Sequence, residues 1–186
     1  MKSALIVIDV QQSFRRRPYW SEKDVPEFIA RLQQLVNRSR AAGVPVLQVF
    51  HVDESEGPQG AFSQHSGLVS VLPQLDITPH GVFRKSVHSA MFASYEQGRS
   101  LDYWLRTHGI ERLIVTGIRT EQCCETTTRH ASDLGYRVSY AMDATLTFPM
   151  TSDSGRTYSA ADIKDRTALV LAGRFAEVTG AEAVTL

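Results

Sequence analysis

The sequence predicts one α/β domain of the doubly wound (Rossmann-like) class, with a mostly parallel six-stranded sheet and helices on both faces. Short apolar runs alternate with amphipathic segments along the whole chain, which is the pattern of successive strand–helix–strand units. Several runs are apolar almost without a break, as in strands that are buried on both faces. No repeat, low-complexity tract or linker interrupts this alternation, so we expect a single domain over residues 1–186.

Six strands are expected. The first is "SALIVIDV" at residues 3–10, which is nearly continuous in apolar and β-branched residues. The other runs also contain β-branched or aromatic residues and are bounded by turn-forming or charged segments. They lie at residues 44–52, 81–85, 112–118, 136–144 and 175–178.

Helices are expected between these strands. Over residues 24–43, apolar side chains recur at the spacing of one helix face, and Gly43 stands where a C-terminal cap belongs. Ser159 and Asp162 are placed nearly as in a capping box, which indicates the start of the last helix. Further helices are expected at residues 66–75, at 100–109, and from the region of Cys123 to about Leu134, with a loop at 145–158.

Composition excludes several classes of function. Lys+Arg and Asp+Glu both number 20, so the formal net charge is zero, and we expect no nucleic-acid partner. The longest apolar runs are strand-sized, and the N-terminus lacks the pattern of a signal peptide. We therefore expect no membrane association and a cytoplasmic location.

The only two cysteines, Cys123 and Cys124, are adjacent in the chain. Neighbouring Cα atoms lie ~3.8 Å apart, below the ~4.4–6.8 Å of ordinary disulfides. Zinc is disfavoured because no second cysteine pair supplies ligand spacing. The two side chains are therefore thiols, and this reasoning leaves open whether each is inert or nucleophilic.

Three residues of reactive type follow separate predicted strands. Asp9 ends the first strand, Lys85 ends the third, and Cys123 falls in the first turn of the helix after the fourth. Each alone is compatible with an ordinary structural role. Together they meet at one edge of a parallel sheet and supply a base, an electrostatic activator and a nucleophile. A helix N-terminus and a nearby lysine both lower the pKa of a thiol, which favours an activated Cys123.

The segments "ALIVIDVQQSF", "FRKSVHSAMF" and "LIVTGIRTEQCCETTTRHASDLGYRVSYAMDA" resemble the signature segments of the isochorismatase-like cysteine hydrolase superfamily. The resemblance implies that Asp9, Lys85 and Cys123 form a catalytic triad. It also implies a cis peptide before Arg119, with the Arg119 and Cys123 N–H groups forming an oxyanion hole. Cys124 stands where family members usually carry an apolar residue, so we expect it in the core. Family members commonly assemble, and we expect a homo-oligomer.

The chain departs from the metal-binding members of this family. Nicotinamidase-like members carry Asp-x-His and a second His after the second strand. His51, Asp53 and His65 are present there, but not in that order. We therefore expect no metal and no cofactor and interpret these three as solvated loop residues, with a metal-ligand role as the less favoured alternative. Nicotinamide is disfavoured as the substrate.

Other side chains near the strand ends are candidates for contact with a small-molecule substrate. They are Phe14, His88 and Phe92. Met91 precedes Phe92 where the family has an aromatic, so either of the two could line the pocket. The run Arg15–Arg17 is interpreted as a solvated face rather than an anion site.

Three functions follow from these residues and the resemblance. The leading hypothesis is hydrolysis of a C–N bond in a small amide, ureido or related substrate through a thioester. The second is vinyl-ether hydrolysis of the isochorismatase type, which the intact triad disfavours because that reaction does not need the nucleophile. The third is a non-catalytic module that binds a small molecule or senses redox state through a reactive thiol.

Overall fold

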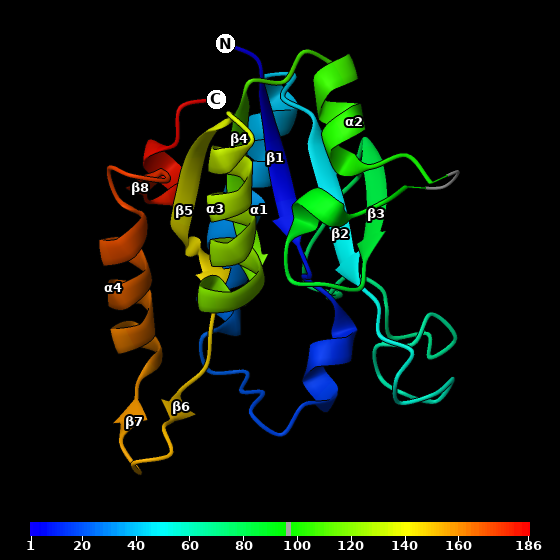
Figure 1. Ribbon diagram of the computed structural model, residues 1–186, viewed down its shortest axis with the longest axis vertical. Helices are drawn as coiled ribbons and strands as arrows, with labels where there is room; N and C mark the ends of the chain where they lie inside the picture. Colours follow the sequence, from blue (N-terminus) through cyan, green and yellow to red (C-terminus); the bar gives the residue numbers. More distant parts are fainter. Residues whose placement is uncertain (96–97) are drawn as a thin grey trace.

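Six parallel strands form the centre of the structure (Figure 1), a computed structural model that describes residues 1–95 and 98–186. Their order is β3-β2-β1-β4-β5-β8, and each neighbouring pair is parallel. The predicted fold class is therefore confirmed. The strands are β1 (Ser3–Ile8), β2 (Val46–His51), β3 (Gly81–Lys85), β4 (Arg112–Ile118), β5 (Arg137–Leu146) and β8 (Glu177–Thr179).

Helices cover both faces of this sheet (Figure 1). Successive residues of a strand point to opposite faces. Leu5 and Val7 accordingly pack in one buried cluster with residues of α1, and Ile6 and Ile8 pack in another with residues of α2 and α3. This two-sided burial explains why β1 is apolar without interruption. The helices are α1 (Val25–Ala41), α2 (Leu101–Thr107), α3 (Glu125–Asp133) and α4 (Ala160–Leu171).

Within the described residues, none of the helices is both long and apolar enough to cross a membrane.

Short elements complete the chain around this framework. The short elements are η1 (Gln12–Arg16), η2 (Ala90–Phe92), η3 (Thr120–Cys124), η4 (Ala181–Ala183) and the hairpin of β6 (Met150–Thr151) and β7 (Thr157–Tyr158).

The strand order changes direction at β1. The chain adds β2 and β3 on one side of β1 and then places β4, β5 and β8 on the other side. β1 and β4 are therefore neighbours at the switch point of the sheet, and ligands of doubly wound folds bind at the carboxyl ends of such strands. Asp9 directly follows β1, and Cys123 lies in η3 after β4, so both residues lie at this end of the sheet.

Gly117 allows β4 to approach β1 closely at this point. Its φ is +125°, and an added Cβ would lie 2.0 Å from the carbonyl oxygen of Ile8. The pairing of β4 with β5 also shifts register between Val115 and Gly117. Only glycine fits here, because any side chain would collide with backbone that cannot move away. Gly117 thus sets the path by which the chain enters η3.

The helix expected over residues 66–75 is wrong. This segment consists of turns and extended backbone, and three backbone hydrogen bonds join it to residues 10–13. Leu72 and Leu75 are buried in the cluster that includes α1. The apolar spacing that suggested a helix therefore reflects two separate anchor points for an irregular segment, and Pro73 between them disfavours a helix.

The loop expected over residues 145–158 is also partly wrong. β5 continues through Leu146, and residues 150–158 contain the β6–β7 hairpin. Thr145 and Leu146 extend the strand because they pair with Gly117 and Ile118 beyond the register shift. The Thr-rich composition indicated a loop, but Thr is also a good strand former.

We predict that Gly117→Ala destabilises the fold by several kcal/mol, because the new Cβ meets the Ile8 carbonyl and the φ is unfavourable. Gly43→Ala is the matched control: Gly43 also has a positive φ, +68°, but an added Cβ there meets nothing within 4 Å. That control is expected to cost only ~1–2 kcal/mol. Urea unfolding of both variants measures the difference. An equal loss in the free energy of unfolding in the two variants would show that the close approach of β4 to β1 does not require glycine at position 117.

Candidate active site

The three residues that the sequence singled out lie together in the structure. The Nζ atom of Lys85 is 2.7 Å from Oδ2 of Asp9 and 3.4 Å from Sγ of Cys123. The side chains of Asp9 and Lys85 are fully buried, and Cys123 is 6% exposed. The expectation that these strand ends bring an acid, a lysine and a thiol into contact is confirmed by these distances.

Asp9 is aimed at this cluster by its backbone. Its φ is +53°, a left-handed conformation that Asp tolerates better than most residues and that ends β1. Its N–H donates to the carbonyl of Val49 in the next strand at 2.8 Å. Oδ2 accepts a hydrogen bond from Lys85, whereas Oδ1 is buried and has no hydrogen-bond partner within the described residues. Oδ1 is therefore the carboxylate atom available to accept a proton.

His51 also contacts Lys85, and the expectation of a solvated loop residue at this position is wrong. His51 ends β2, is half-buried, and pairs in register with Lys85 of β3. Its Nδ1 lies 3.2 Å from Nζ of Lys85. A lysine ammonium has three donors and no acceptor. The three atoms around Nζ, from Asp9, His51 and Cys123, match that number.

Within the described residues, neither of the other two residues weighed as metal ligands, Asp53 and His65, bonds to Lys85. Asp53 accepts a hydrogen bond from the N–H of Ser55 at 2.9 Å, and His65 is exposed in the loop after β2. Among residues 1–95 and 98–186, no group of three or more His, Cys, Asp or Glu side chains is arranged to hold a metal ion.

The charges in the cluster support one another. Burial by itself would lower the pKa of Lys85, but Asp9 and Cys123 together outweigh it and raise the pKa above its ordinary value. Burial, followed by the neighbouring Lys85 charge, lowers the pKa of His51. At neutral pH the cluster therefore contains a cationic lysine and a neutral imidazole.

The thiol of Cys123 is less acidic than we expected from the helix end and Lys85 alone. Burial raises the pKa of Cys123 most, the Asp9 carboxylate raises it further, and Lys85 lowers it only in part. Desolvation disfavours the thiolate because a buried anion loses its hydration. The expected net lowering of this pKa is thus wrong, and Cys123 is a neutral thiol at neutral pH.

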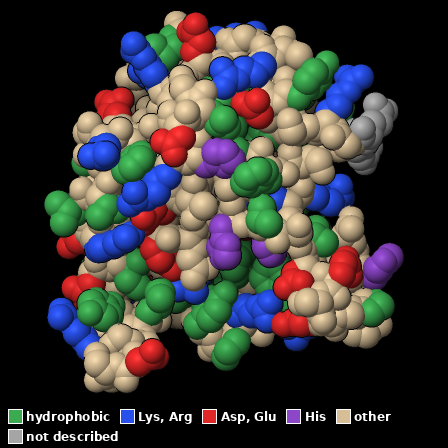
Figure 2. All heavy atoms as spheres, in the orientation of Figure 1, with side chains coloured by type: hydrophobic (Ala, Val, Ile, Leu, Met, Phe, Trp, Pro, Cys, Tyr) green, Lys and Arg blue, Asp and Glu red, His purple; other side chains and the backbone are tan. Residues whose placement is uncertain are grey.

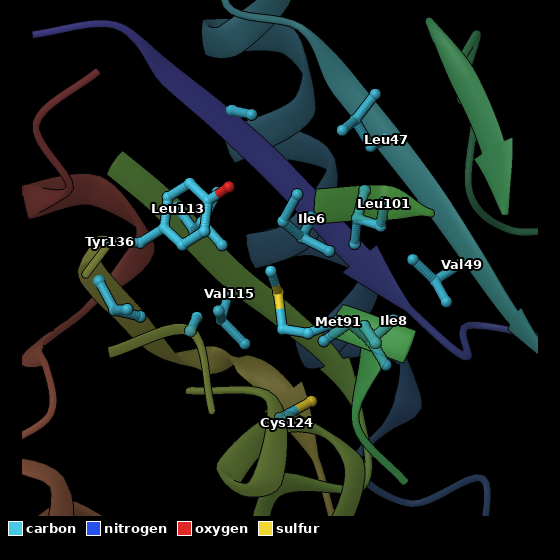
Figure 3. Packing of buried hydrophobic residues seen from close by; sticks show 14 of the residues in the cluster. Ile6, Ile8, Leu47, Val49, Met91, Leu101, Leu113, Val115, Cys124 and Tyr136 are labelled. Carbon is cyan, nitrogen blue, oxygen red and sulfur yellow. The ribbon is translucent and has the colours of Figure 1, made fainter. Parts of the chain in front are cut away.

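Cys124 belongs to the core, as expected. It is fully buried in the cluster that contains Met91 and Val115, and Figure 3 shows it among these hydrophobic side chains. Met91 therefore fills the core, whereas its neighbour Phe92 is 67% exposed. Which of these two residues lines the site stays a prediction.

The backbone next to Cys123 has the expected form. The peptide bond between Ile118 and Arg119 is cis. Residues 120–124 form a π-type turn in which the N–H of Cys124 donates to the carbonyl of Arg119 at 3.2 Å. The guanidinium of Arg119 pairs with Glu121 at 2.7 Å and lies 4.7 Å from the ring centre of Tyr19.

The candidate substrate contacts lie at different depths. Phe14 is buried and packs edge-on against Phe62. The centre of the Phe62 ring lies 5.8 Å from the centre of the His51 ring. His88 is exposed in the loop after β3, and Phe92 packs on the ring of His130 at 4.8 Å. Figure 2 shows histidine and hydrophobic side chains gathered in the middle of this face of the molecule.

The sequence did not identify Tyr19 as a residue near the site. It indicated surface charge at Arg15–Arg17, and the pairs that Arg15 and Arg17 form at the surface agree with that interpretation. Tyr19 is half-buried under Arg119, and burial raises its pKa although the Arg119 charge opposes the shift. Arg15 pairs with Glu22 at 3.0 Å and Arg17 with Glu56 at 2.7 Å, at the surface. The only sequence signal for Tyr19 was its position in the segment between β1 and α1, which follows Asp9 in the chain.

A doubly wound sheet whose switch point carries a buried acid, lysine and thiol is typical of a hydrolase. Residues 3–182 match the model of the isochorismatase domain. The chain belongs to the isochorismatase family and is a hydrolase.

Individual relatives agree with this assignment. Streptothricin hydrolase of Streptomyces noursei is 30% identical over 178 residues, which are 94% of this chain and 58% of that longer protein. Nicotinamidase 3 of Arabidopsis thaliana is 28% identical over 158 residues, covering 78% of this chain and 74% of the relative. The solved structure of a cysteine hydrolase from Pseudomonas syringae pv. phaseolicola has a TM-score of 0.82 at 26% identity, covering 97% of this chain and 89% of the other.

We predict that iodoacetamide alkylates Cys123 with a rate that rises about tenfold per pH unit between pH ~7 and ~9 and shows no plateau, because only the thiolate reacts and its pKa is raised. Site-resolved mass spectrometry measures the rate, and Cys123→Ala is the control that abolishes this labelling. A plateau close to pH 7 would mean that the thiolate already dominates there and would contradict the assigned direction of the shift.

Proposed function

We propose that the protein hydrolyses a C–N bond of a small amide, ureido or related substrate through a thioester on Cys123. The observation that carries this proposal is the contact of Lys85 Nζ with both Asp9 and Cys123 in a buried site. The amide chemistry is supported by the names of two relatives, a nicotinamidase and a streptothricin hydrolase. The structure of a related cysteine hydrolase supports the use of the thiol.

The first half of the reaction transfers the acyl group to sulfur. Oδ1 of Asp9 takes the proton of the Cys123 thiol while Sγ attacks the substrate carbonyl carbon. The raised pKa of Cys123 makes this base necessary, because the resting group is a thiol. The N–H groups of Arg119 and Cys123 stabilise the oxyanion. The C–N bond then breaks, and Asp9 returns the proton to the leaving nitrogen.

The second half regenerates the enzyme. Water attacks the thioester carbonyl and gives one proton to Asp9, the C–S bond breaks, and the sulfur takes that proton as the carboxylic acid product leaves. Lys85 remains a cation throughout, because its pKa is raised by Asp9 and Cys123 despite burial. Its charge stabilises both the carboxylate of Asp9 and the negative charge that develops on Sγ.

The substrate contacts are part of the proposal. Phe14 would form the inner wall of the site together with Phe62, against which it packs. The exposed side chains of His88 and Phe92 would form its outer rim. The cytoplasmic location and the homo-oligomer stay predictions from the sequence. The resemblance motivates the oligomer, and light scattering at micromolar concentration tests it.

We predict that Cys123→Ala abolishes ammonia release from the amide or ureido compound that the wild-type protein hydrolyses best, whereas Cys124→Val keeps most of the activity. Cys124 is fully buried in a hydrophobic cluster, and Val adds a single heavy atom there, so this core change is expected to cost about 1–3 kcal/mol of stability at most. A coupled ammonia assay over a panel of small primary amides and ureido compounds provides the measurement.

Three outcomes would contradict the proposal. Equal loss in the two variants would remove the assignment of one nucleophile. Retained turnover in Cys123→Ala, with cleavage of an enol ether such as isochorismate, would support vinyl-ether hydrolysis. Absence of turnover on the whole panel, with reversible oxidation of Cys123, would support a redox-sensing module.

A further inference from the structure

Three groups surround the Lys85 ammonium, and the third of them, His51, takes no part in the proposed chemistry. Asp9 Oδ2 accepts one N–H as the partner of opposite charge, and Cys123 Sγ accepts another as the nucleophile. His51 Nδ1 lies 3.2 Å from the same nitrogen. It comes from β2, which separates β1 from β3 in the sheet. Lys85 must cross the end of β2 to reach Asp9, and His51 stands at that crossing.

His51 is held rigidly at the crossing by its own main chain. Its N–H donates to Oε1 of Gln11 at 2.8 Å, and its carbonyl accepts from Nε2 of Gln11 at 3.0 Å. Gln11 is fully buried, and its Nε2 also donates to Oγ of Ser13 at 2.9 Å. The ring of His51 packs edge-on against Phe62. The position of Nδ1 is therefore fixed from both backbone and ring.

The contact with Lys85 also fixes the protonation of the ring. An ammonium can only donate, so Nδ1 is the acceptor and the ring proton is on Nε2. The charged or titratable groups that act on His51 are Lys85, Asp9, Asp53 and His88. Burial and Lys85 lower its pKa in spite of the two carboxylates, which keeps the Nδ1 lone pair available at neutral pH.

We propose that His51 is a positioning residue, whose Nδ1 lone pair holds the Lys85 ammonium over Asp9 and Cys123. Without this acceptor, one N–H of a buried ammonium has no partner, which is costly. The ammonium then moves toward another acceptor or toward water, and its contact with Cys123 is lost. The catalytic consequence rests on the proposed hydrolysis, but the consequence for the thiol does not.

Two variants of nearly the same shape test this role. His51→Asn places Oδ1, an acceptor, at the branch position of Nδ1, whereas His51→Leu places a methyl group there. The readout is the alkylation rate of Cys123 by iodoacetamide at pH ~8, where only the thiolate reacts. A rise of one pKa unit slows alkylation only about three- to fourfold, because the scarcer thiolate is also more nucleophilic.

We expect His51→Leu to alkylate at least about threefold more slowly than the wild-type protein, and His51→Asn to remain within about twofold. If His51 only packs against Phe62, Leu is the better substitute and the order reverses. Equal rates, or a faster Leu variant, would overturn the proposal. His51→Ala removes the acceptor without bringing an apolar group to the ammonium, so the same slowing is expected there if the Leu variant does not fold.

Turnover of the best amide substrate adds a second readout. We expect kcat to fall at least about tenfold in His51→Leu and to recover in His51→Asn, with KM little changed, because Lys85 acts on the charge that develops in the reaction. If the protein proves not to hydrolyse amides, the alkylation order of the two variants still tests the role of His51. If His51→Leu and His51→Asn alkylate at equal rates while the wild-type protein hydrolyses amides normally, only the role of His51 is rejected and the proposed function stands.

Discussion

The buried ammonium of Lys85 is the interaction on which the rest of the site depends. A charge that is removed from water costs several kcal/mol unless it is paired and its hydrogen bonds are satisfied. Lys85 meets that condition with Asp9, His51 and Cys123. These residues come from the ends of β1 and β2 and from the turn after β4, so the cation can be accommodated only after the central strands have paired.

The fold supplies this arrangement through a few backbone features. The reversal of strand order at β1 places Asp9 and Cys123 at the carboxyl ends of the neighbouring strands β1 and β4. The left-handed conformation of Asp9 ends its strand, and the close approach at Gly117 brings β4 beside Ile8. The sheet is buried on both faces, so these backbone positions are fixed by packing.

The fold and three residues of the site could be predicted because their signals are local. An apolar run that ends in Asp, Lys or a glycine-led turn identifies a strand end, and parallel strands bring such ends together. His51 could not be placed in this way, because its contact depends on the register between β2 and β3, which pairs it with Lys85. The sequence contains that residue, but no local pattern relates positions 51 and 85.

The acidity of the thiol was mispredicted for a related reason. A helix end and a lysine can be inferred from sequence, whereas the extent of burial depends on the whole packed structure. Cys123 is 6% exposed and Asp9 is fully buried beside it, and these two effects outweigh Lys85. The segment 66–75 illustrates the same limit, because three of its backbone hydrogen bonds join it to residues 10–13, which are distant in the sequence.

The most direct measurement of the central role of Lys85 compares the alkylation rate of Cys123 in Lys85→Met and Asp9→Asn at pH ~8. Lys85 lowers the pKa of Cys123 and Asp9 raises it. The Met variant should therefore react more slowly than wild type and the Asn variant faster, each by about three- to fourfold per pKa unit. Both variants should lose hydrolysis. Rates that change in the same direction would contradict an ammonium placed between the acid and the thiol.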